Sequence, residues 1–363
     1  AETCQLECKN CVEFAIYNTP CMNWIWKRKL QSMLTSGLTI IAEIGSVHDG
    51  SFGNACKAIE MAANVGADAV KFQTHISEAE TLIDAPSPSY FAGETRYEYF
   101  KRTGFDKPQW QALKQHADSH GIIFLSSPFS LEAVDLLEEI GMGAWKVPSG
   151  EVSNLPLLER IANTRQPVLL SSGMSDWGEI DKAVEILKSA CPLVVMQCTS
   201  AYPCDNDQVG LNVIPEIIKK YNVPAGFSDH TLGLAAPIAA VAMGAVVIEK
   251  HLTFSKQMYG SDAQHSLEPT EFAQMVKELR SAFEIVNSPV TKDAKPFREM
   301  KAIFEKSVVA ARDLDAGTIL TAADIAFKKP GTGINASRYK QIIGMKLKKA
   351  CKADAQLEET WLA

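Results

Sequence analysis

The strongest constraint on the fold is a regular alternation between Leu38 and Ser288. Short apolar runs rich in β-branched residues alternate there with longer segments of helical periodicity, and eight runs are each followed by a helical segment. Eight strand–helix units in about 250 residues are typical of a (β/α)8 (TIM) barrel, an α/β fold with parallel strands. A doubly wound open sheet is the alternative, but no Gly-x-Gly-x-x-Gly motif follows the first run.

The alternation predicts the position of each element. The predicted strands are Thr39–Ile44, Ala67–Gln73, Ile122–Ser126, Ala144–Val147, Pro167–Ser171, Leu193–Cys198, Ala225–Phe227 and Ala245–Glu249. The predicted helices are Asn54–Val65, Lys107–His120, Leu131–Ile140, Leu155–Asn163, Trp177–Ser189, Asn212–Tyr221, Leu234–Met243 and Pro269–Val286. The stretch from Thr74 to Asp106 reads as a long functional loop after the second strand.

The segments outside this pattern give the domain organisation. Residues 1–37 are rich in Cys, show no clean period and are treated as an extension of unknown role. Residues 38–288 form the predicted catalytic barrel, and the polar residues 289–304 read as a linker. Residues 305–363 form a small second domain with a short strand at Ser307–Ala311 and a capped helical turn at Thr321–Ile325.

Composition and charge exclude several classes of protein. With 46% hydrophobic and 22% charged residues, the chain is not disordered as a whole. Its 36 basic and 43 acidic residues give a net charge of -7, which argues against a general nucleic-acid or anionic-membrane binder. No apolar run reaches the length of a membrane span. The five cysteines after residue 37 are expected to be free thiols, so we expect a cytoplasmic protein.

Polar residues gather at the predicted carboxyl ends of the strands, where barrel enzymes place their chemistry. Lys71 and Lys146 stand in otherwise apolar strand ends, and buried lysines are costly unless they are paired. An ion pair with Glu43 or Glu151 is the structural interpretation. The functional one is a grip on a phosphate or carboxylate, aided by nearby serine hydroxyls. A Schiff-base lysine is the third, and we favour anion binding.

Two histidines follow neighbouring strands. His230 and His251 end the seventh and eighth strands, and two imidazoles so placed can share a divalent metal. Asp229 and Glu249 lie within two residues of them, where carboxylates commonly orient metal-binding histidines. A histidine-based proton shuttle is the alternative to the metal site.

Several motifs at these positions together resemble the sialic acid synthase family, which includes N-acetylneuraminate synthases and their legionaminate and pseudaminate relatives. The motifs that carry the resemblance are Ile41–Gly45, Gly66–Thr74, Ser127–Phe129, Pro148–Glu151, Ser172–Met174, Gln197–Pro203, Phe227–Gly233, Ile248–His251, Gly260–Asp262 and Ser266–Pro269. The tail resembles the antifreeze-like (SAF) domain that this family appends to its barrel, with Lys329–Gly333 carrying the match.

The resemblance implies a condensation. Phosphoenolpyruvate would add through its C3 to the aldehyde of an N-acetylated hexose such as N-acetylmannosamine, and a nine-carbon 2-keto acid and phosphate would result. The residues implied to hold phosphoenolpyruvate are Lys71, Ser127, Lys146, Ser149, Ser200 and Ser228. The residues implied to bind sugar hydroxyls are Glu43, Gln73, Glu151, Tyr202 and Asp262, and Glu43 could also transfer a proton.

The resemblance also implies a cofactor and an assembly. His230 and His251 would bind Mn2+ or Mg2+, which would polarise the aldehyde as a Lewis acid. The small domain would cap the barrel of a partner subunit in a domain-swapped homodimer. Lys329 stands where many family members have an Arg that reaches the sugar's N-acyl group, and lysine lacks the bidentate fork of arginine. Val47 stands where the family often has Asn.

Other interpretations stay open. Within the enzyme class, the product could be a legionaminate, a pseudaminate or an N-acylneuraminate 9-phosphate; a metal-dependent pyruvate aldolase is more distant. In another class, the chain could be a non-catalytic carbohydrate-binding protein. Cys4, Cys8 and Cys11 have a spacing like that of iron–sulfur enzymes, but they precede the first strand; with Cys21 they could bind zinc instead.

Overall fold

A computed structural model describes residues 37–86, 93–260 and 262–363 of the chain. The extension before Gly37, with its cluster of four cysteines, therefore lies outside the described residues. The chain divides into two compact units at Ser288/Pro289, and each unit is described by itself. None of the helices in the described ranges has the length and apolarity that crossing a membrane requires.

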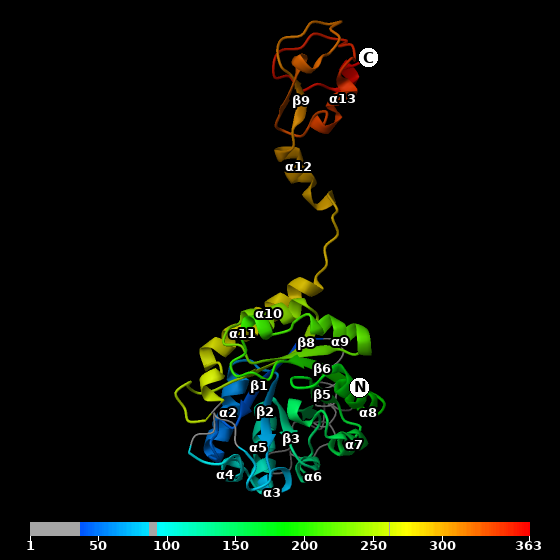
Figure 1. Cartoon of the computed structure of the whole chain (residues 1–363). Helices are drawn as coiled ribbons and strands as arrows, with labels where there is room; N and C mark the ends of the chain where they lie inside the picture. The colour runs from blue at the N-terminus through cyan, green and yellow to red at the C-terminus, as the bar shows by residue number, and fades with distance from the viewer. Residues whose placement is uncertain (1–36, 87–92, 261) are drawn as a thin grey trace, which may run out of the picture. The chain divides into compact units, whose positions relative to one another are not determined.

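The first unit is a parallel eight-stranded barrel surrounded by helices (Figure 1). Its strands are β1 (Thr39–Gly45), β2 (Ala69–Thr74), β3 (Ile123–Pro128), β4 (Trp145–Val147), β5 (Val168–Ser171), β6 (Leu193–Cys198), β7 (Ala225–Asp229) and β8 (Ala245–His251). They are ordered β3-β2-β1-β8-β7-β6-β5-β4, and contacts between β3 and β4 close the ring. The predicted TIM barrel is confirmed, with every strand end within two residues of its expected place.

The surrounding helices occupy the expected positions. They are α2 (Phe52–Asn64), α5 (Lys107–Ser119), α6 (Leu131–Glu139), α7 (Leu155–Asn163), α8 (Trp177–Lys188), α9 (Val213–Tyr221), α10 (Ala235–Ala242) and α11 (Pro269–Asn287). Local sequence fixes where several begin. Asp106 and Asp176 each accept a hydrogen bond from the backbone N–H three residues on, in a reciprocal capping box that satisfies otherwise unpaired donors.

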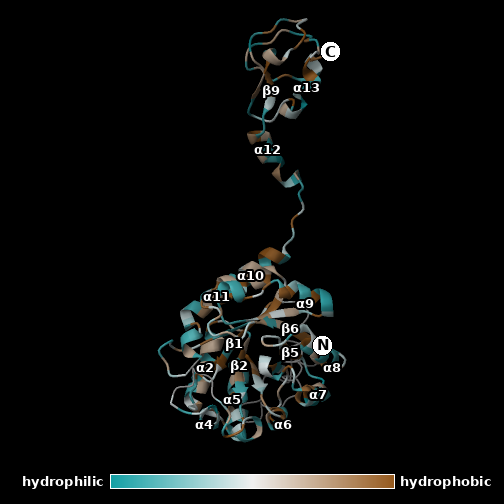
Figure 2. Ribbon diagram, in the orientation of Figure 1, coloured by the Kyte–Doolittle hydropathy of each residue, from teal (hydrophilic) through white to brown (hydrophobic). Residues whose placement is uncertain are grey.

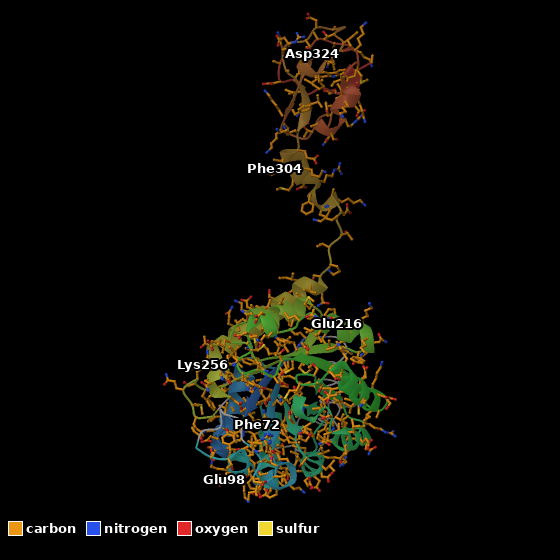
Figure 3. The ribbon with its side chains drawn as sticks, viewed as in Figure 1. Phe72, Glu98, Glu216, Lys256, Phe304 and Asp324 are labelled. Carbon is orange, nitrogen blue, oxygen red and sulfur yellow. The ribbon has the colours of Figure 1, made fainter. Side chains whose placement is uncertain are left out.

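Two apolar cores lie on opposite sides of the strands. One fills the barrel interior and includes Ile41, Leu125 and Met196, while the other packs the outer strand faces against the helices. Figure 2 shows the bands of hydrophobic and hydrophilic residues that this packing produces along the helices. Figure 3 places Phe72, which is fully buried, within the unit, and Glu216 at its periphery.

Strand alternation determines which polar side chains point into the barrel. Along β8, Val247 belongs to the interior core, so Glu249 and His251 share its face while Lys250 points to the opposite side. Along β1, Ile41 is interior and Glu43 follows it on the same face. The lower layers of the barrel interior are thus apolar, and the layer at the carboxyl ends of the strands is polar.

The segment after β2 is not the plain loop that the sequence predicts. It contains α3 (Ser77–Glu80) and α4 (Arg96–Thr103), and Thr95 starts α4 with a capping box. Tyr99 and Phe100 are buried on the short apolar face of α4. The helical pattern was not recognised in the sequence because charged residues surround these two positions. The prediction of a loop without helices was therefore wrong, and the functional role of the segment stays a prediction.

The second unit is built on a two-stranded antiparallel sheet of β9 (Ser307–Ala310) and β10 (Ile325–Lys328). Its own core includes Val308, Leu320 and Leu357. The short helices of this unit are α12 (Arg298–Phe304), α13 (Tyr339–Ile342) and 3-10 turns at Lys295–Phe297, Ala322–Asp324, Ala336–Arg338 and Glu359–Trp361. The expected linker therefore ends in a helix, and the expected turn at Thr321 is present with a capping box.

Candidate active site

Strand register gathers three chemically distinct side chains at one end of the barrel. Glu43 on β1 stands opposite Lys71 on β2 and opposite His251 on β8. All three side chains are buried, with at most 7% of each residue exposed. The Nζ of Lys71 lies 2.7 Å from Oε2 of Glu43, in an ion pair shielded from water. This is the ion pair that the structural interpretation of Lys71 predicted, beside the anion-binding interpretation that was favoured.

Glu249 is the centre of the charged layer. Its Oε1 lies 3.7 Å from Nζ of Lys71 and 3.6 Å from Nζ of Lys146, and it accepts a hydrogen bond from Ser228. Burial alone would raise its pKa, but the two lysines outweigh that effect and hold the pKa well below its usual range. The carboxylate is therefore charged and bridges two ammonium groups.

The two lysines differ in their surroundings. Burial lowers the pKa of Lys71, but Glu249 and Glu43 outweigh burial and the net pKa is raised. Burial and the neighbouring Lys71 lower the pKa of Lys146, and Glu249 offsets only part of this. The ion-pair partners predicted for the two lysines were Glu43 or Glu151. Lys146 pairs instead with Glu249, because Glu151 lies in the turn after β4 while Glu249 points into the barrel.

Serine hydroxyls surround this layer. Ser127 accepts from Lys71 at 3.1 Å, and Ser171 accepts from Lys146 at 2.7 Å. Ser149 and Ser200 converge on Gly173: a Cβ there would lie 2.5 Å and 2.4 Å from their Oγ atoms. The residues expected to hold an anion thus fall into small groups: Lys71 with Ser127, Lys146 with Ser171, and Ser149 with Ser200 beside Gly173. Ser228 is linked to both lysines through its hydrogen bond to Glu249.

The two expected metal ligands lie side by side. The rings of His230 and His251 have centroids 5.8 Å apart. The Nδ1 of His230 lies 2.8 Å from the carbonyl of Thr199, so this nitrogen carries the proton and Nε2, 3.0 Å from the Tyr202 hydroxyl, keeps its lone pair. Burial lowers the pKa of His251, and its buried Nδ1 has no hydrogen-bond partner among the described residues. These donors fit a two-histidine metal site.

The carboxylates expected to orient those histidines form ion pairs with lysines instead. Asp229 pairs with Lys250, Nζ to Oδ2 at 2.5 Å, on the outer faces of β7 and β8. Both side chains are almost fully buried, so the pair is a structural ion pair between the strands and the helices. Within the described ranges neither Asp229 nor Glu249 hydrogen-bonds a histidine ring. The prediction was wrong because proximity in sequence ignored the alternation of strand faces.

A hydrogen-bonded chain that sequence analysis missed supports Glu43 from the side. Gln73 donates through Nε2 to Oε1 of Glu43 at 2.8 Å, and its Oε1 lies 3.1 Å from Nε2 of His75. Nδ1 of His75 lies 2.8 Å from Oε1 of Glu80. The His75 ring is stacked between Phe100 and Phe129. The signal in the sequence was weak, since Glu80 lies on the helix that was read as loop.

The remaining expected sugar ligands line the same end of the barrel. Asp262 accepts from the backbone N–H and the hydroxyl of Ser46, both at 3.1 Å. Glu151 accepts from Asn154, and burial raises the pKa of its carboxyl. Tyr202 is 47% exposed and reaches His230. These three groups come from three different loops, after β4, β6 and β8, and barrel sites are commonly assembled from several such loops.

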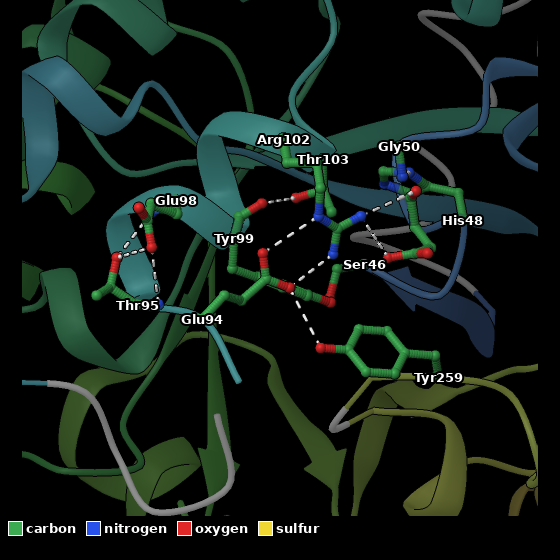
Figure 4. A network of polar contacts seen from close by, with 11 residues as sticks. Ser46, His48, Gly50, Glu94, Thr95, Glu98, Tyr99, Arg102, Thr103 and Tyr259 are labelled. Atoms are coloured by element: carbon green, nitrogen blue, oxygen red, sulfur yellow. Dashed lines mark hydrogen bonds and ion pairs between the residues drawn. The ribbon is translucent and has the colours of Figure 1, made fainter. Parts of the chain in front are cut away.

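A surface network fixes the segment that contains α4 (Figure 4). Arg102 forms ion pairs of 2.8 Å with Asp49 and with Glu94, and Tyr259 donates to Glu94. Tyr99 donates to Ser46, which contacts Asp262. The loops after β1 and β8 are thereby tied to α4 at the mouth of the barrel. Lys329, the last expected site residue, lies exposed in the second unit, its ammonium 5.0 Å from the Phe304 ring centroid.

The outer surface holds one more group of metal-ligating side chains. Glu60, His116 and His120 offer ligand atoms that all lie within 4.8 Å of one another. These residues belong to α2 and to α5 with its C-cap, so the group lies outside the barrel and is separate from His230 and His251.

Comparison with known proteins agrees with the geometry. The NeuB family profile matches residues 58–291, and a SAF domain profile matches residues 305–359. The chain is 36% identical to the N,N'-diacetyllegionaminic acid synthase of Campylobacter jejuni, over 88% of this chain and 98% of that protein. It is 38% identical to the human N-acetylneuraminate-9-phosphate synthase, over 78% and 80% of the two chains.

Solved structures give the same picture. The crystal structure of an N-acetylneuraminic acid (sialic acid) synthetase from Leptospira borgpetersenii, in complex with citrate, superposes with a TM-score of 0.66 at 32% identity. The match covers 73% of this chain and 90% of that one.

Proposed function

Because the chain belongs to the NeuB family, we propose that it is a nonulosonic acid synthase that condenses phosphoenolpyruvate with an N-acetylated hexose. The observation that carries this proposal is the buried layer in which Glu249 bridges Lys71 and Lys146. Two buried lysines ringed by hydroxyls suit a small ligand with more than one negative charge. A pyruvate aldolase would need only one carboxylate site.

Phosphoenolpyruvate carries a phosphate and a carboxylate, and we assign each of them to a separate cluster. One cluster is Lys71 with Ser127; the other is Lys146 with Ser171, beside Ser149 and Ser200 at Gly173. Ligand oxygens would take over the ammonium hydrogens that Glu249 and Glu43 now face. Charge-assisted hydrogen bonds of this kind are about twice as strong as neutral ones.

The proposed reaction is a condensation at the bound enol phosphate. C3 of phosphoenolpyruvate forms a bond to the aldehyde carbon, and water adds at C2. The bond between C2 and the bridging oxygen then breaks, and phosphate leaves with that oxygen. Glu43, fixed by Gln73 and Lys71, is placed to exchange a proton with the reacting oxygens.

A divalent metal fits the same site. His230 and His251 would hold it, and when bound it would supply positive charge to polarise the aldehyde oxygen. The residues around the histidines position them for this: the Thr199 carbonyl fixes the tautomer of His230, and Tyr202 packs against its ring at 4.1 Å.

The acceptor sugar would lie against the polar groups of the loops. Gln73, Glu151, Tyr202 and Asp262 are the proposed hydroxyl ligands, and Lys329 of a partner copy is the proposed contact to the N-acyl group. The relatives include synthases of legionaminic, pseudaminic and N-acetylneuraminic 9-phosphate products, so the acceptor has to be found by experiment.

The test is phosphate release from phosphoenolpyruvate with Mn2+ across N-acetylmannosamine, its 6-phosphate and the 2,4-diacetamido-2,4,6-trideoxyhexoses. Release with one sugar and a nine-carbon keto acid by mass spectrometry would support the proposal. With 18O at the bridging position, the label should appear in phosphate. Label in the keto acid, or no turnover by folded, metal-loaded protein, would refute the proposed reaction and leave a carbohydrate-binding role.

A further inference from the structure

A cluster on the outside of the barrel has the composition of a metal site. His116 on α5 and His120 at its C-cap lie four residues apart, one helical turn, and Glu60 comes from the neighbouring helix α2. Two imidazoles and one carboxylate form a ligand set typical of Zn2+ and other late first-row divalent ions. The proposed reaction uses none of these residues.

The three ligand atoms lie within 4.8 Å of one another, and one pair has the separation expected around a bound ion. Nε2 of His116 lies 3.3 Å from Oε1 of Glu60. With zinc–ligand bonds of about 2.0–2.1 Å in a tetrahedron, two ligand atoms lie about 3.3–3.4 Å apart. Nε2 of His116 is also shielded from solvent and has no hydrogen-bond partner among the described residues. These two atoms form an ion pair when the imidazole is protonated, and a metal ion would take the place of that proton between them.

The groups around the cluster orient its ligands. Nδ1 of His120 lies 2.9 Å from the carbonyl of His116, so it carries the proton and Nε2 keeps the lone pair that a metal needs. Lys57 holds Oε2 of Glu60 at 2.7 Å, which leaves Oε1 facing His116 as the ligand atom. Glu60 and His116 are partly exposed and His120 is exposed, so an ion can enter from solvent.

We propose that Glu60, His116 and His120 form a second metal site, which binds Zn2+ or a similar late transition ion with water as the fourth ligand. The site links α2 to α5 on the outside of the barrel. It differs from the proposed Mn2+ or Mg2+ site in its place outside the barrel and in its third protein ligand, the carboxylate of Glu60. Its occupation stabilises the barrel unit and leaves the reacting groups untouched.

The test is titration of Zn2+ into the full chain carrying His230→Ala and His251→Ala, which lacks both proposed catalytic ligands. Cys4, Cys8, Cys11 and Cys21 are replaced by Ser in every variant, so that the thiols of the extension cannot bind the ion. We expect one equivalent of Zn2+ to bind, and a Zn2+ excess to raise the thermal midpoint by about 5 °C. Adding His116→Gln and His120→Gln should weaken binding at least about tenfold, a change of about 1.4 kcal/mol. His265→Gln is the matched control and should change neither quantity.

Binding of Co2+ gives a second readout. A four-coordinate Co2+ site should produce visible absorption bands in the His230→Ala/His251→Ala chain, and these should vanish with His116→Gln and His120→Gln. The proposal is overturned if the first variant binds no Zn2+, or if removing His116 and His120 leaves binding unchanged while circular dichroism shows an intact fold.

Discussion

At the scale of single residues, Glu249 links the stability of the barrel to its chemistry. Its carboxylate lies within 4 Å of both Lys71 and Lys146, and none of the three residues is more than 5% exposed. Removing one partner from a buried charge network leaves the others uncompensated in a medium that solvates them poorly. A single substitution here is therefore expected to change folding stability and, under the proposed function, ligand binding.

We expect Glu249→Gln to lower the free energy of unfolding by about 3–5 kcal/mol and to reduce kcat at least about a hundredfold. The glutamine keeps the shape of the side chain but cannot neutralise two ammonium groups. Urea denaturation and phosphate release measure the two effects. Glu216→Gln, on the exposed face of α9, should change neither; an equally stable and active Glu249→Gln chain would contradict the assigned bridge.

His48 gives a pH-dependent prediction at the same scale. Burial lowers its pKa from 6.5 to about 4, although Asp49 and Asp262 act in the opposite direction, and its Nδ1 accepts from the Gly50 N–H. The unfolded chain takes up a proton near pH 6.5 and the folded chain only near pH 4. Stability is therefore lost as the pH falls between these values, by about 3 kcal/mol in full.

The comparison that isolates this effect is His48→Asn, whose side-chain oxygen can replace Nδ1 as acceptor. The difference in unfolding free energy between the two chains should change by about 3 kcal/mol from pH 7 to pH 4, in favour of the asparagine chain at low pH. A constant difference across that range would show that His48 is not held neutral in the folded state.

At the scale of elements, the end of β5 controls the approach of two loops. Gly173 follows this strand, and a methyl group there would meet Ser149 and Ser200 at 2.5 Å and 2.4 Å. We expect Gly173→Ala to raise the KM for phosphoenolpyruvate at least about tenfold, while the free energy of unfolding changes little. Gly37→Ala, where no atom lies within 4 Å of the added Cβ, is the matched control. An unchanged KM would place the phosphate or carboxylate elsewhere.

Elements with a strong period could be predicted from sequence, and those without one could not. The strands of the barrel were found because apolar runs such as Leu193–Cys198 are bounded by turns. The helices α3 and α4 were missed because α3 is only four residues long and α4 has charged residues between its buried positions. A helix of this kind forms through tertiary contacts, here those of Tyr99 and Arg102.

The candidate site shows the same division. The location of Lys71, Glu43 and the two histidines at one end of the barrel could be predicted, because each lies near the carboxyl end of a strand and these ends meet in a barrel. The role of Glu249 could not be read from its distance to His251 in the sequence. The face it shares with Val247 determines its partners, and this alternation was visible in the apolar run Ala245–Ile248.

At the scale of the whole molecule, the two units have separate cores. The proposed assembly, in which the small domain of one copy caps the barrel of its partner, can be tested with two variants. Lys329→Ala should remove the proposed contact to the sugar, and His251→Ala should remove a metal ligand. Each homodimer should be inactive or nearly so. In a domain-swapped heterodimer, the intact barrel of the Lys329→Ala chain would be capped by the intact small domain of the His251→Ala chain.

Co-expression of the two variants should therefore restore about a quarter of the wild-type activity, from half of the dimers with one working site each. If each small domain instead served its own barrel, no site in the mixture would be intact and no activity would return. Size-exclusion chromatography and mass spectrometry of the mixed dimers provide the control for assembly.

The charged layer of the barrel has a consequence for turnover. Lys71 and Lys146 are matched in charge by Glu43 and Glu249 within the protein itself. At the mouth of the barrel, the positive charges of the two lysines are therefore already neutralised by carboxylates of the protein. Under the proposed function, an arriving anion would displace a carboxylate from its lysine, and that carboxylate would return when the product leaves. Product release would then not require water or salt to solvate two uncompensated ammonium groups.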